Sequence, residues 1–186
     1  MIIMDSVAAY KKDSAMYTLA PDEKATTVLV YTFHSLVRGD LVTKQSARVS
    51  IWPRMQAQVY YTHIHKPQVL FFGGTQMKAL AYEEMHIPIS EILVFHIAPP
   101  AQEPLDYDPN EANRTMADVN LMLGSFLLKG KVRISTHTDF ANSIEVAHSG
   151  WLSVYDVEIA NPFVQQWPVI QTAMLLVNPM HVSFGV

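Results

Sequence analysis

The sequence predicts an all-β protein made of two tandem, similar small barrels of about five strands each, with at most one or two short helices. Three observations support this fold class. Short runs rich in Val, Ile, Tyr, Phe and Thr alternate with Gly, Pro, Ser and Asn along most of the chain, which is typical of strands and turns. No long segment has a strong 3.6-residue apolar period. Finally, one stretch of the sequence recurs later in the chain.

The recurring stretch is VYYTHIHKP at Val59–Pro67, which returns as VYDVEIANP at Val154–Pro162. Tyr60 falls on Tyr155 in this alignment, so Tyr60 is predicted to be the buried, structural tyrosine and Tyr61 the exposed one. Because successive side chains of a strand point to opposite faces, only one of the two can enter a core.

Two further segments extend the alignment in both directions. Upstream, Gly39 falls on Gly130, and downstream the segment His86–Ile97 falls on Leu175–Val186. Self-similar units usually bury an apolar face against a neighbour. Each unit is near the size at which a lone core is marginally stable, so we expect the two units to share an interface.

These alignments divide the chain into four parts, which are a tail at 1–24, a first barrel at 25–98, an acidic, Pro-rich linker at 99–117 and a second barrel at 118–186. The expected β runs of the first barrel are 28–37, 47–53, 57–65, 68–72, 78–88 and 92–97. Those of the second barrel are 119–135, 142–149, 151–161, 172–178 and 181–186.

The unit resembles Sm-like and SH3-like small barrels in the order of its elements. The residues that carry the resemblance are the pair Gly39-Asp40-Leu41 and Gly130-Lys131-Val132, and the three-residue turns Ile89-Ser90-Glu91 and Pro179-Met180-His181. The Met-Asn pair and the Arg-Gly loop of Sm-like RNA binders are missing from the corresponding positions, so the resemblance implies the barrel and not an RNA site. The layout is also similar to uncharacterised bacterial β-domains, for which the resemblance implies no activity.

Composition narrows the classes of function. The formal charge is −4 and the pI about 6.0, so no global positive field attracts a nucleic-acid backbone. The chain has no cysteine, which excludes disulfides, thiol nucleophiles and thiolate metal ligands. The first residues lack the pattern of a secretory signal, and no apolar run approaches the roughly 20 residues that span a bilayer. We therefore expect a soluble, cytoplasmic protein with no membrane partner.

His63-Ile64-His65 is the best candidate for a metal site. Residues i and i+2 of a strand project from the same face, so both imidazoles can approach one Zn²⁺ or Fe²⁺ ion. The candidates for a third ligand are His86, His96 and Glu84. The alternative is an ordinary solvent-exposed strand face, because the second unit has Glu158 and Ala160 at the aligned positions. A divalent metal is the one cofactor that the sequence suggests.

A second set of residues suggests single-stranded nucleic acid, which binds to aromatic stacking platforms beside positive charge. The set comprises Arg48, Trp52, Arg54 and Tyr61. The alternative is that Trp52 fills the barrel and leaves the two arginines as surface charges. The acidic net charge makes nucleic acid an unfavoured partner.

Two other patterns carry no function. Residues 106–110 begin like a calcium loop, but Glu111 stands where that loop needs Gly, so a solvated acidic linker is expected. Gly73-Gly74 is expected to form a hairpin turn. A Gly-x-Ser-x-Gly nucleophile elbow is missing from the sequence, and a non-catalytic protein is favoured over an enzyme.

The favoured function is a non-catalytic module for binding and assembly, which associates with itself through β-strand edges and recognises an unknown protein or small ligand. Unpaired edges must be paired, covered or charged, and the apolar run HVSFGV at 181–186 is the candidate edge. It would pair with the other unit or with another copy, giving a homo-oligomer. A metal protein or metalloenzyme with a site at His63 and His65 is the first alternative, and nucleic-acid binding is the second.

Overall fold

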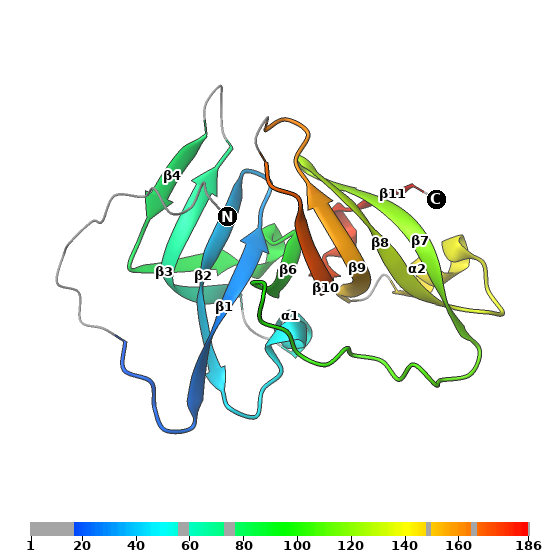
Figure 1. The fold of residues 1–186 in the computed structure, drawn as a ribbon, viewed down its shortest axis with the longest axis horizontal. Coiled ribbons are helices and arrows are strands. Elements are labelled where there is room, and N and C mark those ends of the chain that lie inside the picture. Colours follow the sequence, from blue (N-terminus) through cyan, green and yellow to red (C-terminus); the bar gives the residue numbers. More distant parts are fainter. Residues whose placement is uncertain (1–16, 56–59, 73–76, 148–149, 165–166, 186) are drawn as a thin grey trace.

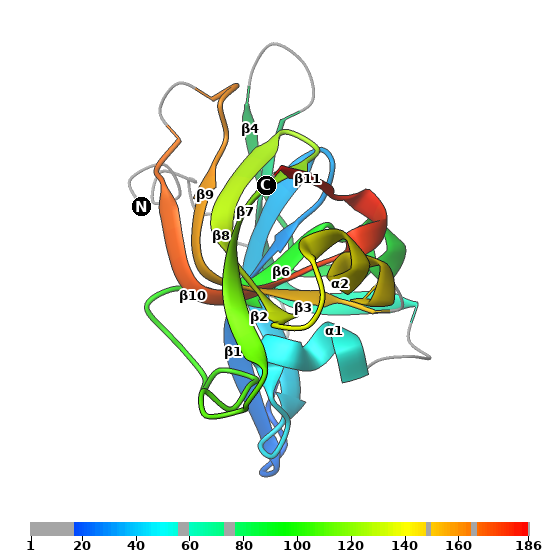
Figure 2. The same ribbon diagram turned by 90° about the vertical axis from the view of Figure 1, so that its right-hand side faces the viewer.

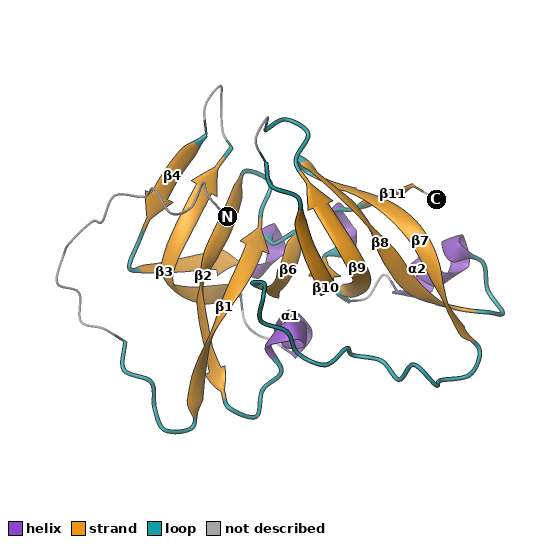
Figure 3. Ribbon diagram, in the orientation of Figure 1, coloured by secondary structure: helices purple, strands orange, loops and turns teal. Residues whose placement is uncertain are grey.

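The computed structural model describes residues 17–55, 60–72, 77–147, 150–164 and 167–185. The chain is mostly β-strand, as predicted, and the helices among these residues are the short α1 (Trp52–Met55) and α2 (Phe140–Ala147) (Figure 3). Neither of these helices has the length and apolar character that a membrane span requires. The predicted turn at Gly73-Gly74 and most of the predicted tail lie outside the described residues.

We call residues 23–97 unit 1 and residues 114–185 unit 2. The strands of unit 1 are β1 (Glu23–Tyr31), β2 (Ser35–Lys44), β3 (Tyr61–Phe71), β4 (Lys78–Ala81), β5 (Glu84–Pro88) and β6 (Val94–Ile97). The strands of unit 2 are β7 (Arg114–Leu123), β8 (Phe126–Ser135), β9 (Leu152–Ala160), β10 (Ile170–Val177) and β11 (Ser183–Gly185). The 3-10 turns are η1 (Val49–Ile51), η2 (Ile89–Glu91) and η3 (Pro179–His181).

All eleven strands belong to one antiparallel sheet. Its order is β11-β7-β8-β9-β10-β6-β1-β2-β3-β4, and β5 pairs with β3 beside β4. Figure 1 shows the middle of this sheet, where β6 of unit 1 lies against β10 of unit 2. The path is open, so the expectation of two separate closed barrels is corrected: the strands of the two units join edge to edge, which satisfies the backbone groups of both edges.

The strand pairings of the two units correspond residue by residue. Val28 of β1 lies opposite Gly39 of β2, and Val119 of β7 lies opposite Gly130 of β8. The next pairing of each unit, β2–β3 and β8–β9, shifts its register at that same glycine. At each bulge, the facing strand has a residue with positive φ. These residues are Lys66 in β3 and Asp156 in β9.

The pairing of first and last strands also corresponds, because Val30 lies opposite Phe95 as Leu121 lies opposite Phe184. The bridging turns η2 and η3 precede those last strands in the same way. The two units therefore share these registers. Beside its third strand, unit 1 has two short strands, β4 and β5, where unit 2 has the single strand β10, so β5 corresponds to the C-terminal part of β10.

These registers correct the predicted match of Tyr60 with Tyr155. His65 lies opposite Asp40 next to the bulge, as Tyr155 lies opposite Lys131, so the counterpart of Tyr155 is His65. Tyr60 precedes β3 and is 84% exposed, whereas Tyr155 is 6% exposed. The sequence alignment rested on a short stretch of identical residues, whereas the position of the bulge determines which side chains face inward.

Several predicted strands also have different limits. The runs 28–37 and 119–135 each contribute to two strands with a tight turn between them. The single strand β3 joins the described part of the run 57–65, from Tyr61, to the run 68–72, as far as Phe71. Helical turns occupy most of the described part of the runs 47–53 and 142–149 instead, as η1 with α1 from Val49 and as α2 up to Ala147. Their β-branched residues suggested strands, but helical turns there bury Val49 and Trp52 in unit 1, and tertiary packing overrides local propensity.

The units share an apolar interface. Val28 and Val30 of β1 face the core of unit 1, whereas Leu29 and Tyr31 of the same strand pack into the core of unit 2. Tyr31 meets Phe126 edge to face, with the ring centroids 5.0 Å apart. The strand β1 is therefore buried on both faces at its end, and the units form one folded body (Figure 2).

The connecting segment, residues 98–113, is packed against both units and is not merely a solvated linker. Unit 2 begins inside the predicted linker, with β7 starting at Arg114. Glu103 accepts hydrogen bonds from the backbone N–H groups of Val49 (3.0 Å) and Ser50 (2.9 Å). These donors open the 3-10 turn η1 and lack partners within it, so a carboxylate is stabilised there.

Candidate metal centre and its counterpart in unit 2

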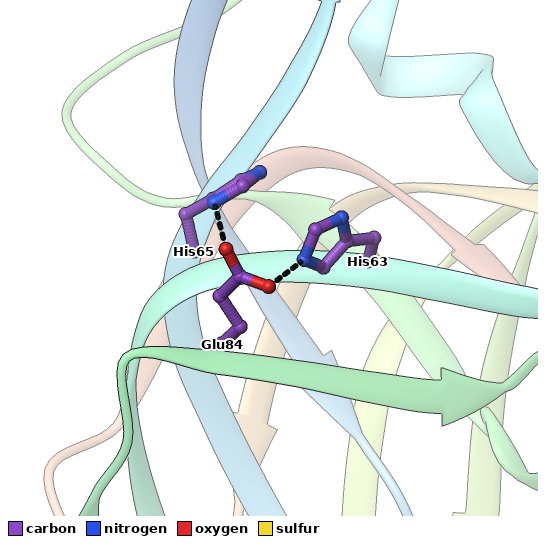
Figure 4. A group of neighbouring side chains, drawn as sticks. All are labelled: His63, His65 and Glu84. Atoms are coloured by element: carbon purple, nitrogen blue, oxygen red, sulfur yellow. Dashed lines mark hydrogen bonds and ion pairs between the residues drawn. The ribbon is translucent and has the colours of Figure 1, made fainter. Parts of the chain in front are cut away.

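Four polar side chains share the outer face of the β3–β5 pair, which we call the histidine cluster. His63 and His65 are two residues apart on β3, before the bulge, and therefore point the same way. Across the pairing, His86 of β5 lies opposite His63, and Glu84 lies opposite His65. Figure 4 shows the Glu84 carboxylate between the two imidazoles.

The donor atoms of three of these side chains converge. Nε2 of His63 is 3.1 Å from Oε2 of Glu84, and Nδ1 of His65 is 3.8 Å from Oε1 of the same carboxylate. One ligand atom from each of the three residues lies within 4.8 Å of both others. His86 stands beside this group with its ring stacked on that of His63, at a centroid distance of 4.2 Å.

Burial differs within the cluster. His65 is 7% exposed because the ring of Tyr17 covers it at a centroid distance of 4.5 Å. Burial lowers the pKa of His65, and the neighbouring His63 lowers it further against the opposing effect of Glu84. A neutral imidazole keeps a lone pair available for a metal ion. His63, Glu84 and His86 are reached by solvent.

The structure thus places the predicted residues His63, His65 and His86 together on one face, with Glu84 as the third member of the converging group. His96, the other candidate, lies elsewhere. It is 1% exposed, accepts at Nε2 from the Tyr31 hydroxyl (3.1 Å) and donates from Nδ1 to the Ile97 carbonyl (2.8 Å).

Unit 2 has different residues at the corresponding positions. Ser153 corresponds to His63, and Tyr155 corresponds to His65. Both hydroxyls donate to Asp106 of the connecting segment, at 2.6 Å each. Arg54 of α1 also pairs with Asp106 and donates to the Ser153 hydroxyl (2.7 Å). We call these four residues the Arg54–Asp106 cluster.

Asp106 is held as a carboxylate in this cluster. Burial is the largest influence and opposes ionisation, but the donors Ser153, Tyr155 and Arg54 together lower its pKa below the usual value. Burial and the adjacent carboxylate raise the pKa of Tyr155, which stays protonated and donates. Sequence reasoning missed this cluster because Asp106 belongs to a polar, Pro-rich segment whose docking leaves no local pattern.

The residues predicted to bind nucleic acid do not form one exposed patch. Trp52 is 9% exposed and stacks on Phe95 in the core of unit 1. Arg54 is engaged by Asp106, and Arg48 donates to the carbonyl of Pro104. Tyr61 is 54% exposed. The arginines bind the connecting segment, so these four residues give the nucleic-acid hypothesis no support, and it stays a prediction.

A shallow hollow of about 790 Å³ lies on the outer face of unit 2 around Gly130. Its charged lining comprises Lys129 and Lys131 together with Asp118, Asp156 and Glu158. Lys131 and Asp156 form an exposed ion pair of 2.9 Å. Both signs of charge line the hollow, so it has no uniform charge that would select an anion or a cation.

A scan of protein-family models and searches of curated proteins and solved structures found no match to this chain.

Proposed function

We propose that the protein is a non-catalytic assembly module whose copies associate head to tail, with β11 of one copy paired to β5 of the next. The observation that carries this proposal is the junction inside the chain. There, β10, the fourth strand position of unit 2, pairs with β6, the last strand of unit 1. In the described parts of the chain, the corresponding edges at the two ends have one neighbour each: β11 pairs with β7, and β5 pairs with β3.

The internal junction specifies the register of the proposed contact. Leu176 lies opposite Phe95 and Val177 opposite Val94 within the chain. If the contact between copies has the same register at the corresponding positions, His86 of one copy lies opposite Phe184 of the other, and Ile87 lies opposite Ser183. The contact is heterologous, so repeating it gives a closed ring or an open filament, depending on the rotation per copy.

The burial of side chains beside the internal junction also supports the proposed contact between copies. Tyr31 and Leu36 of unit 1 are 0% and 2% exposed because unit 2 covers them. Their counterparts in unit 2, Met122 and Leu127, are 55% and 43% exposed. Apolar side chains at these positions are suited to a second copy, and burying them is favourable.

The common register also supports the interpretation that the two units are duplicated copies of one Sm-like unit, whose strands here join one open sheet and do not close into separate barrels. Gly39 and Gly130 hold the same bulge, and η2 and η3 lie before the same strand. We propose that duplication fixed one junction inside the chain and left the other for contacts between chains.

Native mass spectrometry and sedimentation of the untagged protein test the association. We expect a defined oligomer or a concentration-dependent series above the 21.0 kDa monomer. Met122→Lys should shift it to monomer, because a charge would be buried at the contact. Met55→Lys is the matched control, since Met55 is 54% exposed on α1 at the internal junction. A monomer at every concentration reached would contradict the proposal.

The absence of cysteine from the sequence allows a second test of the register. Gly185 and Met85 lie opposite one another in the proposed contact, so Gly185→Cys protein mixed with Met85→Cys protein should form a disulfide-linked heterodimer. Leu19→Cys, at an exposed position outside the contact, serves as the control for Met85→Cys. Equal cross-linking of both pairs would show that the contact is not the one proposed.

A further inference from the structure

We propose that His63, His65 and Glu84 bind one divalent metal ion of the zinc class. This inference concerns a single chain and does not rest on self-association. The three residues come from two paired strands, and their donor atoms already face one another across the β3–β5 pair (Figure 4). Two imidazoles and one carboxylate are ligands that zinc accepts.

The distances fit an ion of that size. A tetrahedral zinc with ligand bonds of about 2.0 to 2.2 Å sets its donor atoms about 3.4 Å apart. Nε2 of His63 is 3.1 Å from Oε2 of Glu84, and Nδ1 of His65 is 3.8 Å from Oε1. One ligand atom from each of the three residues lies within 4.8 Å of both others. Small side-chain rotations therefore bring all three atoms to bonding distance while the backbone stays in place.

The surroundings favour a cation. Asp40 lies opposite His65 on β2 and adds a second negative charge near the ring. Tyr17 covers His65 and keeps water from one side of the site. Magnesium and calcium prefer sets made of oxygen ligands, so two histidines select zinc-like ions instead.

The corresponding positions of unit 2 serve as an internal reference. Ser153, Tyr155 and Met174 replace His63, His65 and Glu84, and none of the three is a usual zinc ligand. The two hydroxyls there are bound by Asp106. One ion per chain is therefore expected, and the three protein ligands leave a fourth coordination position for water or another ligand.

Zinc titration of the metal-free, untagged full chain tests the site, with native mass spectrometry for stoichiometry and calorimetry for affinity. We expect one ion per chain and a rise in the thermal midpoint. Cobalt should give the visible absorption of a tetrahedral complex.

His63→Gln and Glu84→Gln change exposed side chains, so the variants should fold, which circular dichroism checks. Losing a ligand should weaken zinc binding by at least about 100-fold, more than the loss of a supporting residue.

His86→Gln is the matched control, because His86 is an exposed histidine of the same cluster. It should keep most of the zinc affinity. No zinc binding by the wild type, or unchanged affinity in both His63→Gln and Glu84→Gln, would overturn the site. An equal loss in His86→Gln would overturn the assignment of the ligands to these three residues. If the protein is monomeric yet binds zinc, the assembly proposal fails and the metal site stands.

Discussion

The histidine cluster and the Arg54–Asp106 cluster are built on corresponding positions of β3 and β9, yet the first is open and the second is covered. In unit 2, α1 and the connecting segment place Arg54 and Asp106 over Ser153 and Tyr155. In unit 1, the ring of Tyr17 covers His65, whereas Glu84 and His86 are exposed. Where a strand pair is covered by its own chain, its polar groups are satisfied internally. Where it is left open, the same positions can bind a ligand.

Removing Asp106 disrupts the covered cluster and should have the largest effect on stability of the variants considered. Asp106→Ala leaves the Arg54 guanidinium without its carboxylate and two hydroxyl donors without an acceptor. We expect a loss of about 4 kcal/mol in the free energy of unfolding, because three donors lose one largely buried acceptor. Urea unfolding measures the change.

Asp22→Ala is the control for Asp106→Ala, because Asp22 is an exposed carboxylate paired with Lys44. Exposed pairs contribute little, so its unfolding midpoint should stay close to that of the wild type. Equal midpoints for the two variants would show that the Arg54–Asp106 cluster does not hold the units together.

Lowering the pH should destabilise the junction by protonating His96 of β6. This histidine is buried, in contrast to the exposed residues of the histidine cluster. Burial lowers the pKa of His96 to about 4 from its ordinary 6.5. Between these two pH values, the unfolded chain binds a proton that the folded chain does not. Stability is therefore full above pH 6.5 and falls as the pH drops toward 4, by about 3 kcal/mol.

Comparing unfolding free energies at several pH values for the wild type and His96→Gln isolates this contribution. The variant loses the hydrogen bonds to Tyr31 and Ile97 and starts from lower stability, but its decline between pH 6.5 and 4 should be shallower. Parallel curves would mean that His96 titrates alike in the folded and unfolded chains.

The sequence was sufficient for the all-β class and for placing His63 and His65 on one face, but not for the single open sheet or the junction. Alternation along β3 placed His63 and His65 on one face, because that spacing is local. The choice of Glu84 as the converging carboxylate depends on the β3–β5 register, which is set across a bend at Tyr82 and Glu83. The burial of Asp106 depends on contacts with residues about 50 positions away in either direction, which no local pattern records.

The two bulge glycines, Gly39 and Gly130, occupy corresponding positions, and their substitution should have the smallest effects on stability. At Gly39, an added methyl group would meet the Ile64 side chain, the His65 carbonyl oxygen at 2.9 Å and the Pro67 Cα at 3.0 Å. Two of these are backbone atoms that cannot move aside. Gly39→Ala should therefore cost about 2 kcal/mol through overpacking and displace the strand that carries His65.

At Gly130, the methyl group would meet side-chain methyls of Val154 (2.9 Å) and Val157 (3.1 Å) and one backbone atom, the Tyr155 carbonyl oxygen at 3.0 Å. Side chains adjust more easily, so Gly130→Ala should cost about 1 kcal/mol. Gly150→Ala is the control, since nothing lies within 4 Å of the added carbon. A larger cost at Gly130 than at Gly39 would mean that the covered unit holds its bulge more tightly than the open one, so that docking of the connecting segment and not local packing sets the rigidity of this bend.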